Sequence, residues 1–98
     1  AYSFSAGASP AHPLLQVFKV TPICPHLPRL TPFELPMDAS ATVRVMLPER
    51  RPVRAVADGQ ATENVVSVRI SMAKLRVKLA FFSGHDFTRQ MMRKLVMP

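Results

Sequence analysis

The chain has 98 residues, which allows one small domain, and a single Cys, which excludes an internal disulfide bond. Apolar residues make up 48% of the chain, which argues against disorder, and no apolar run approaches the roughly 18 residues of a transmembrane helix. The net charge of +7 favours an anionic partner, such as nucleic acid, an acidic surface or a phosphorylated ligand.

The N-terminal residues 1–13 are mostly small and polar. We expect residues 1–7 to end a short helix with Gly7 as its C-cap. Residues 9–13 should form a loop, because Pro10 and Pro13 prevent both a helix and a central strand. Such a segment contributes little to a core, but it suits close approach of the backbone to a ligand, with hydroxyl groups nearby.

An apolar run rich in β-branched residues predicts the first strand, near residues 15–20. Residues 21–36 then contain five Pro residues, which exclude a helix and predict an extended, kinked connection. The apolar side chains of this connection indicate that it packs against other parts of the chain. Cys24 is expected to be a small, buried apolar residue within it.

The second half of the chain alternates apolar and polar residues, the pattern of half-buried strands. The alternation predicts strands near residues 41–47, 52–57, 65–72 and 75–81. Asp58 and Gly59, directly after the second of these strands, form the strongest hairpin signal in the chain.

The period of the apolar residues changes from two to four near the C-terminus, at Phe87, Met91 and Leu95. This change predicts a helix near residues 85–96. Ser83 and Asp86 resemble the two members of a capping box, with Asp in place of the usual Glu. Taken together, the elements predict a mainly β fold with a C-terminal helix.

No constellation for catalysis or metal binding stands out in the sequence. His12, His26 and His85 lack metal-ligand spacing, and each is expected to be a structural or surface residue. Asp58 suits local hydrogen bonding in its turn, and Asp86 suits a helix start. Because there is also no Ser-His-Asp order, P-loop or GxGxxG motif, we assign no catalytic and no metal-binding residue.

The basic residues concentrate in the second half, because only Lys19 and Arg29 precede residue 44 and the other eleven of the 13 follow. Alternation places five of them on outward strand faces: Arg44, Arg54, Arg69, Arg76 and Lys78. A solvated sheet face is the simplest interpretation. A nucleic-acid surface is an alternative, although no aromatic side chains interleave for base stacking, and a subunit contact or a phosphate-rich ligand is a third.

AYxxSAG at residues 1–7 is followed by HP at residues 12–13 and by TPICPH at residues 21–26. These motifs, in this order, resemble those of the NAD kinase family. ERRPVRAVADG at residues 49–59 and GHDF at residues 84–87 also resemble family segments, so the resemblance covers nearly the whole chain. Two departures are Ala8, where the family usually has a second Gly, and the missing Thr that begins its first motif.

The resemblance implies that residues 1–98 are part of the family's C-terminal β-sandwich domain, which binds NAD. NAD kinases transfer the γ-phosphoryl group of ATP to the adenosine 2′-hydroxyl of NAD and make NADP. The matching positions assign NAD binding to Ala1, Tyr2 and Ser5. The family's GGDGT motif and its catalytic Asp belong to an N-terminal α/β domain that these residues do not contain, so we expect the isolated fragment to be inactive.

The resemblance also implies partners and a setting. ATP is expected with a divalent metal, Mg²⁺, that this chain does not bind alone. We expect a homo-oligomer in the cytoplasm, with no membrane or nucleic-acid partner. The alternative hypothesis is a non-enzymatic basic β module that binds nucleic acid or a protein.

Overall fold

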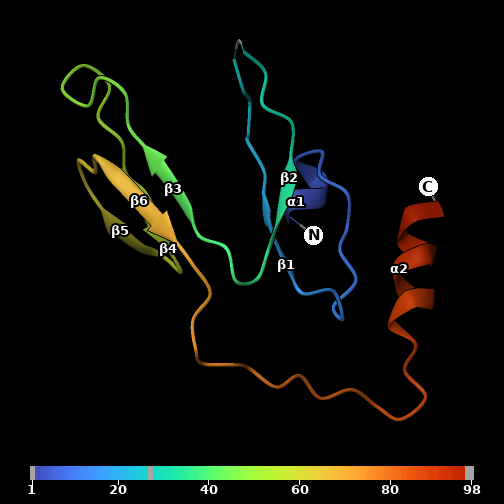
Figure 1. Ribbon diagram of the computed structural model, residues 1–98. Helices are drawn as coiled ribbons and strands as arrows, with labels where there is room; N and C mark the ends of the chain where they lie inside the picture. Colours follow the sequence, from blue (N-terminus) through green and yellow to red (C-terminus); the bar gives the residue numbers. More distant parts are fainter. Residues whose placement is uncertain (1, 27, 97–98) are drawn as a thin grey trace. The chain divides into compact units, whose positions relative to one another are not determined.

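The computed structural model describes residues 2–26 and 28–96, whose elements follow the order α1, β1 to β6 and α2 (Figure 1). The chain divides into two compact units, residues 1–37 with 74–98 and residues 38–73. The first unit holds both helices with β1 and β2, and the second holds β3 to β6. The mainly β fold with a C-terminal helix is therefore confirmed.

Helix α1 spans Tyr2–Ser5, and Gly7 forms the turn that terminates it, as predicted. The amide of Gly7 donates to the carbonyl of Phe4 (3.0 Å), and the amide of Ala8 donates to the carbonyl of Ser3 (2.9 Å). This pair of bonds is the Schellman motif, which needs a left-handed residue after the helix. Gly7 supplies it with a φ of 100°, so the chain turns sharply away from α1.

Strands β1 (Val17–Val20) and β2 (Phe33–Pro36) form an antiparallel pair in which Lys19 faces Glu34. The prediction for residues 15–20 is confirmed, but the prediction that residues 21–36 form only an irregular connection is wrong at their end. Two residues of this strand, Phe33 and Leu35, still pair well because Pro36 occupies a strand end, where a missing amide hydrogen is tolerated.

Cys24 also departs from its prediction, because it is exposed. It lies at the turn of the connection between β1 and β2, with a φ of 53°. A residue in this left-handed conformation marks a reversal of the chain at the surface, which leaves a small side chain no apolar surroundings to enter.

Helix α2 spans Phe87–Val96, which confirms the predicted C-terminal helix. Its N-cap is Asp86, whose Oδ1 accepts a hydrogen bond from the amide of Arg89 at 3.1 Å. The capping box that the sequence indicated at Ser83 therefore lies three residues too early, because Asp86 is the cap and not the third helical residue. Arg93 and Lys94 occupy the last turn, where positive charge is favoured by the helix dipole.

The predicted strand at residues 75–81 is wrong. Residues 75–82 carry no ladder of hydrogen bonds, and Lys74 before them is a bend. Leu75, Val77 and Leu79 are 86%, 83% and 74% exposed. A strand is defined by pairing with a neighbour, and none of the described residues pairs with this segment, so a correct alternating pattern does not become a strand.

In the second unit, β3 (Ala41–Arg44) pairs with β6 (Ser67–Ile70), and β4 (Ala55–Ala57) pairs with β5 (Gln60–Thr62), all antiparallel. Each lies inside or beside a predicted strand except β5, which the alternation did not indicate. Asp58 and Gly59 form the predicted turn, with φ values of 49° and 79°. Two positive φ values in a two-residue loop are the requirement of a type I′ hairpin, so the hairpin is confirmed.

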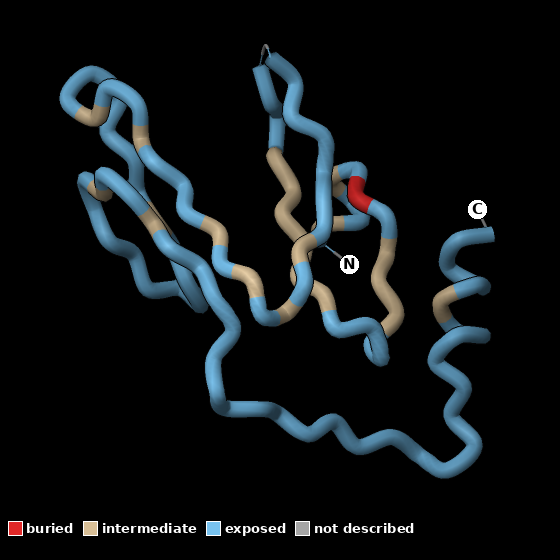
Figure 2. The backbone as a smooth tube through the Cα atoms, in the orientation of Figure 1, coloured by how far each residue is buried: buried red, intermediate tan, exposed pale blue. Residues whose placement is uncertain are grey.

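The described strands thus form three two-stranded sheets, and the two larger sheets of a sandwich are not seen among them. In the β3–β6 sheet, Val43 lies opposite Val68, so the apolar residues share one face as the alternation predicts. Among the described residues, Ala8 is the only buried hydrophobic residue, at 4% exposure (Figure 2). Apolar faces have formed, but the described chain does not bury them.

The exposed apolar surface makes a prediction about the isolated 98-residue chain. Because so little apolar surface leaves water, the free energy of unfolding should be small, and open strand edges should promote association. Size-exclusion chromatography with light scattering should show concentration-dependent association, and the dye ANS should bind. A monomer at high concentration with a sharp, reversible melt would contradict this expectation.

Candidate functional site

A hollow of about 660 Å³ in the first unit lies between the N-terminal segment and the C-terminal helix, and is called here the inter-helix hollow. Its volume is in the usual range for small-molecule sites. Residues from α1, the following loop, β1 and the C-terminal segment line it: Ser3, Phe4, Ser5, Pro10, Ala11, Lys19, Phe81, His85, Phe87, Gln90, Met91, Lys94 and Leu95. The mixture of apolar and aromatic walls with a few polar groups is typical of a ligand pocket.

A cluster of aromatic rings forms part of the wall of this hollow. Phe81 and His85 are stacked, with ring centroids 4.5 Å apart and planes 5° from parallel. Phe87 meets Phe81 edge-on at 6.2 Å and His85 edge-on at 6.0 Å. These are the favourable geometries for aromatic pairs, so each ring restricts the orientation of the other two.

His12 joins the N-terminal loop to α2. The amide of Leu14 donates to Nδ1 of His12 at 3.2 Å, so Nε2 carries the ring hydrogen and donates to Oγ1 of Thr88 at 2.9 Å. The ring of His12 also meets Phe87 edge-on at 6.0 Å. His12 is thus a structural residue, as the sequence predicts, and it holds the first turn of α2 beside the loop that follows α1 (Figure 1).

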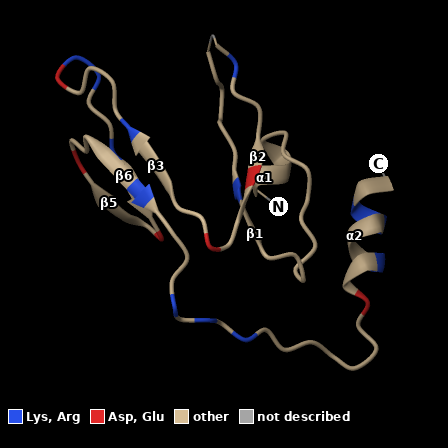
Figure 3. Ribbon diagram, viewed as in Figure 1, with Lys and Arg blue, Asp and Glu red and all other residues tan. Residues whose placement is uncertain are grey.

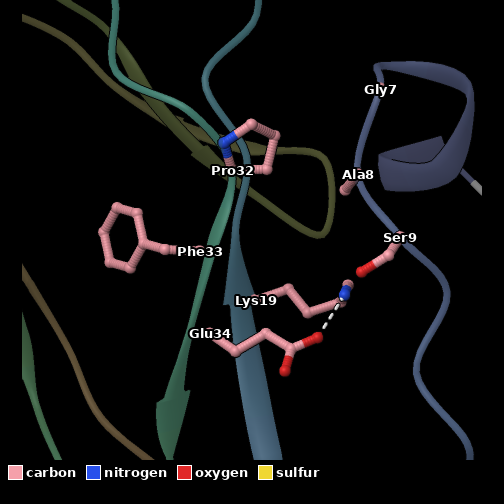
Figure 4. Close-up of a pocket in the computed structure, with 7 residues that line it drawn as sticks. All are labelled: Gly7, Ala8, Ser9, Lys19, Pro32, Phe33 and Glu34. Carbon is pink, nitrogen blue, oxygen red and sulfur yellow. Dashed lines mark hydrogen bonds and ion pairs between the residues drawn. The ribbon is translucent and has the colours of Figure 1, made fainter.

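A second, smaller hollow of about 320 Å³ is lined by Gly7, Ala8, Ser9, Lys19, Pro32, Phe33 and Glu34 (Figure 4). Nζ of Lys19 lies 2.6 Å from Oε1 of Glu34, and the side chain of Lys19 is only 16% exposed. The side chain of Ser9 points toward this pair (Figure 4). Since the carboxylate of Glu34 compensates the charge of Lys19, neither hollow gains a free positive charge from it.

The three residues predicted to bind NAD have different positions. Ser5 lines the inter-helix hollow. Tyr2 is 80% exposed and lines neither hollow. Ala1 lies outside the described residues. Sequence reasoning missed the groups that α2 contributes, Gln90 and Lys94; the apolar stripe of α2 was recognised, but nothing local indicated what it would face.

The described residues contain no arrangement suited to a metal ion. Over residues 2–26 and 28–96, no three His, Cys, Asp or Glu side chains gather closely enough to hold one. No described helix is long and apolar enough to cross a membrane.

Lys and Arg residues occur in both units of the chain (Figure 3). Nε of Arg54 lies 2.7 Å from Oε1 of Glu63, and both side chains are well exposed. Arg69 donates a long hydrogen bond of 3.4 Å to Oγ of Ser40. Arg76 and Lys78 lie in the segment of residues 75–82, which carries no ladder of hydrogen bonds. Exposed pairs of this kind contribute little stability.

Comparisons with known proteins bear on this arrangement. A family model described as the ATP-NAD kinase C-terminal domain matches residues 1–83. An NAD kinase from Clostridium botulinum (strain Kyoto, type A2) is 33% identical over 97 residues, which cover 97% of this chain and 34% of that protein. An NAD kinase from Clostridium beijerinckii is 31% identical over 99 residues, with 98% and 34% coverage.

A relative from yeast matches the chain over a shorter length. An NAD(+) kinase from Saccharomyces cerevisiae is 40% identical over 60 residues, or 61% of this chain and 11% of that protein. The chain spans about a third of the length of the Clostridium relatives that it matches. No solved structure matches it.

The contribution of the hydrogen bond between His12 and Thr88 to the position of α2 can be tested in the full-length protein that contains this chain. Thr88→Val keeps the shape of the side chain but removes the hydroxyl group, so the N-terminal end of α2 should loosen by about 0.5–1.5 kcal/mol. Hydrogen exchange of residues 87–91, followed by mass spectrometry, should then be up to about tenfold faster. Thr88→Ser keeps the hydroxyl and serves as the control; equal exchange in both variants would show that the bond does not hold α2.

Proposed function

This chain belongs to the NAD kinase family, and we propose that the protein that carries it transfers the γ-phosphoryl group of ATP to the adenosine 2′-hydroxyl of NAD, giving NADP. The observation that carries the proposal is the extent of the family match, from residue 1 through residue 83. The match includes the segment that forms α1 and its Gly7 turn.

We assign this chain the binding of NAD, through Ala1, Tyr2 and Ser5. The position of Ser5 on the wall of the inter-helix hollow supports this role, because its hydroxyl can both donate to and accept from a ribose or base. The exposed ring of Tyr2 is available to pack against the dinucleotide. Gly7 acts on the backbone and not on the ligand, since it ends the helix that presents Ser5.

The phosphoryl donor is assigned to other parts of the protein. Phosphoryl transfer depends on positioning and on cations that neutralise the charge of the transferred group. Mg²⁺ prefers carboxylate and water oxygens in octahedral geometry, and the described residues do not fit such a site, because their acidic side chains do not gather. We therefore derive no step through a metal ion from these residues. The proposal further places the enzyme in the cytoplasm as a homo-oligomer.

From the proposed role of Ser5 we predict how the KM values of the full-length protein that contains this chain change on substitution. Ser5→Ala removes one hydrogen bond to a bound ligand, which typically costs about 1–3 kcal/mol, or roughly 5- to 150-fold in affinity. Tyr2→Ala removes a ring and a hydroxyl group and should cost at least as much. The KM for NAD should rise in both variants, and the KM for ATP should change little, because neither residue reaches the donor.

Ser9→Ala is the matched control, since it removes the same kind of hydroxyl group from the loop that follows α1, and Ser9 lines the smaller hollow but not the inter-helix hollow. Its KM for NAD should stay near that of the unchanged protein. The nucleic-acid hypothesis makes the opposite forecast: Ser5→Ala would be silent, and Arg69→Ala and Arg76→Ala would weaken DNA or RNA binding and reduce its salt dependence. NAD titrations of Ser5→Ala and Tyr2→Ala that match the unchanged protein would refute the assignment.

A chimera tests whether this chain performs the family role. Residues 1–98 replace the matching third of the Clostridium botulinum NAD kinase, and NADP formation is measured with ATP and NAD. We expect the chimera to make NADP and the isolated chain to make none. A chimera with the corresponding Clostridium beijerinckii segment is the positive control. If that control is active and the chimera with this chain is folded but inactive and fails to bind NAD, the proposed function is wrong.

A further inference from the structure

We propose that α2 forms the second wall of the nucleotide site and that Lys94 binds a phosphate group of the dinucleotide in the inter-helix hollow. The inference rests on the proposed function, since it takes NAD as the ligand that Ser5 contacts. It adds a binding residue from an element that neither the family motifs at residues 1–26 nor the matched residues 1–83 include.

The geometry of α2 presents a polar row to the hollow. Gln90 and Lys94 are four residues apart, as are Met91 and Leu95, and all four line the hollow. Residues at this spacing share one face of a helix, so a polar row lies beside an apolar row. Ser5 lines the same hollow from α1, which makes a ligand that contacts Ser5 a neighbour of α2.

Charge distinguishes Lys94 from the other lysine of the hollow. Lys19 is held at 2.6 Å from the carboxylate of Glu34, so its charge is already compensated. Among the ion pairs of the described residues, Lys19–Glu34 and Arg54–Glu63, none involves Lys94. Lys94 is an exposed residue beside Met91 and Leu95 on the wall of the hollow, so its ammonium group is accessible to an anion that enters there.

The remaining walls suit the rest of a nucleotide. The stacked rings of Phe81 and His85, with Phe87 edge-on to both, offer aromatic surface of the kind on which a planar base stacks. The bond from His12 to Thr88 holds α2 beside the loop that follows α1, so His12 acts as a positioning residue for the wall that carries Lys94. A flat base and an anionic phosphate are thus matched by an aromatic cluster and a free ammonium group.

The test measures the affinities of the full-length protein that contains this chain for NAD, AMP and adenosine by isothermal titration calorimetry. Lys94→Gln should weaken the binding of NAD and AMP about 10- to 100-fold, the usual range for a lost hydrogen bond to a charged group. Adenosine, which has no phosphate, should bind equally to both proteins. Arg93→Gln is the control, because it removes the same charge from the adjacent position of α2, and Arg93 does not line the hollow. Lys94→Arg should restore most of the affinity.

A second measurement needs no substitution. Acetic anhydride labels exposed lysines, and NAD should protect Lys94 from labelling at least several-fold while leaving Lys74 and Lys78 unprotected, as read by mass spectrometry. This experiment applies even if Lys94→Gln does not fold.

The outcomes separate the two proposals. If the unchanged protein does not bind NAD, the proposed function fails. If it binds NAD and Ser5→Ala weakens binding, but Lys94→Gln behaves like Arg93→Gln and Lys94 is not protected, the proposed function stands and this inference is overturned. An equal loss of adenosine affinity in Lys94→Gln would likewise exclude a phosphate contact.

Discussion

The contact between His12 and the first turn of α2 is the interaction on which the inter-helix hollow depends. It joins residues 76 positions apart, through a hydrogen bond of 2.9 Å and an edge-on ring contact with Phe87. The N-terminal segment and α2 both contribute lining residues, so neither segment alone can form the hollow. Because the bond of Leu14 to Nδ1 selects the tautomer of His12, a short local hydrogen bond determines which ring nitrogen reaches Thr88. The side chain of His12 therefore combines a local hydrogen bond, to Leu14, with a long-range one, to Thr88.

The backbone after α1 sets the position of Ser5 in a similar way. A helix of four residues has almost no intrinsic stability, since most of its hydrogen-bonding groups are terminal. Its end is nevertheless well defined, because both bonds of the Schellman motif are formed and Ala8, the residue that completes the motif, is buried. The left-handed conformation of Gly7 then turns the chain into a loop whose residues line both hollows. Ala8, where the family usually has a second Gly, fits this position because its small side chain enters the one buried place among the described residues.

The apolar strand faces that are exposed in this chain can be covered in the longer relatives, which have more polypeptide. In the β3–β6 sheet, Val43 lies opposite Val68, yet Val43 and Ile70 remain 53% and 45% exposed. A two-stranded sheet cannot cover its own face, and within this unit β4 and β5 form a separate two-stranded sheet. The relatives are about three times as long as this chain, so they have further polypeptide available to cover such faces. Leu75, Val77 and Leu79 are likewise exposed. Their segment would need both a neighbouring strand and a covering layer to bury them.

The sequence by itself determined the features that depend on near neighbours. Gly7 ends α1, Asp58 and Gly59 make the hairpin turn, and Asp86 starts α2, because each acts through bonds or backbone angles within a few residues. Only the tertiary structure decided the features that need a distant partner. β2 exists because β1 pairs with it, residues 75–81 are no strand because nothing described pairs with them, and Ser5 and Lys94 line one hollow because the fold brings α1 and α2 to it. The physical reason is that a ladder bond or a cavity wall requires two surfaces, and an alternating or helical pattern specifies only one of them.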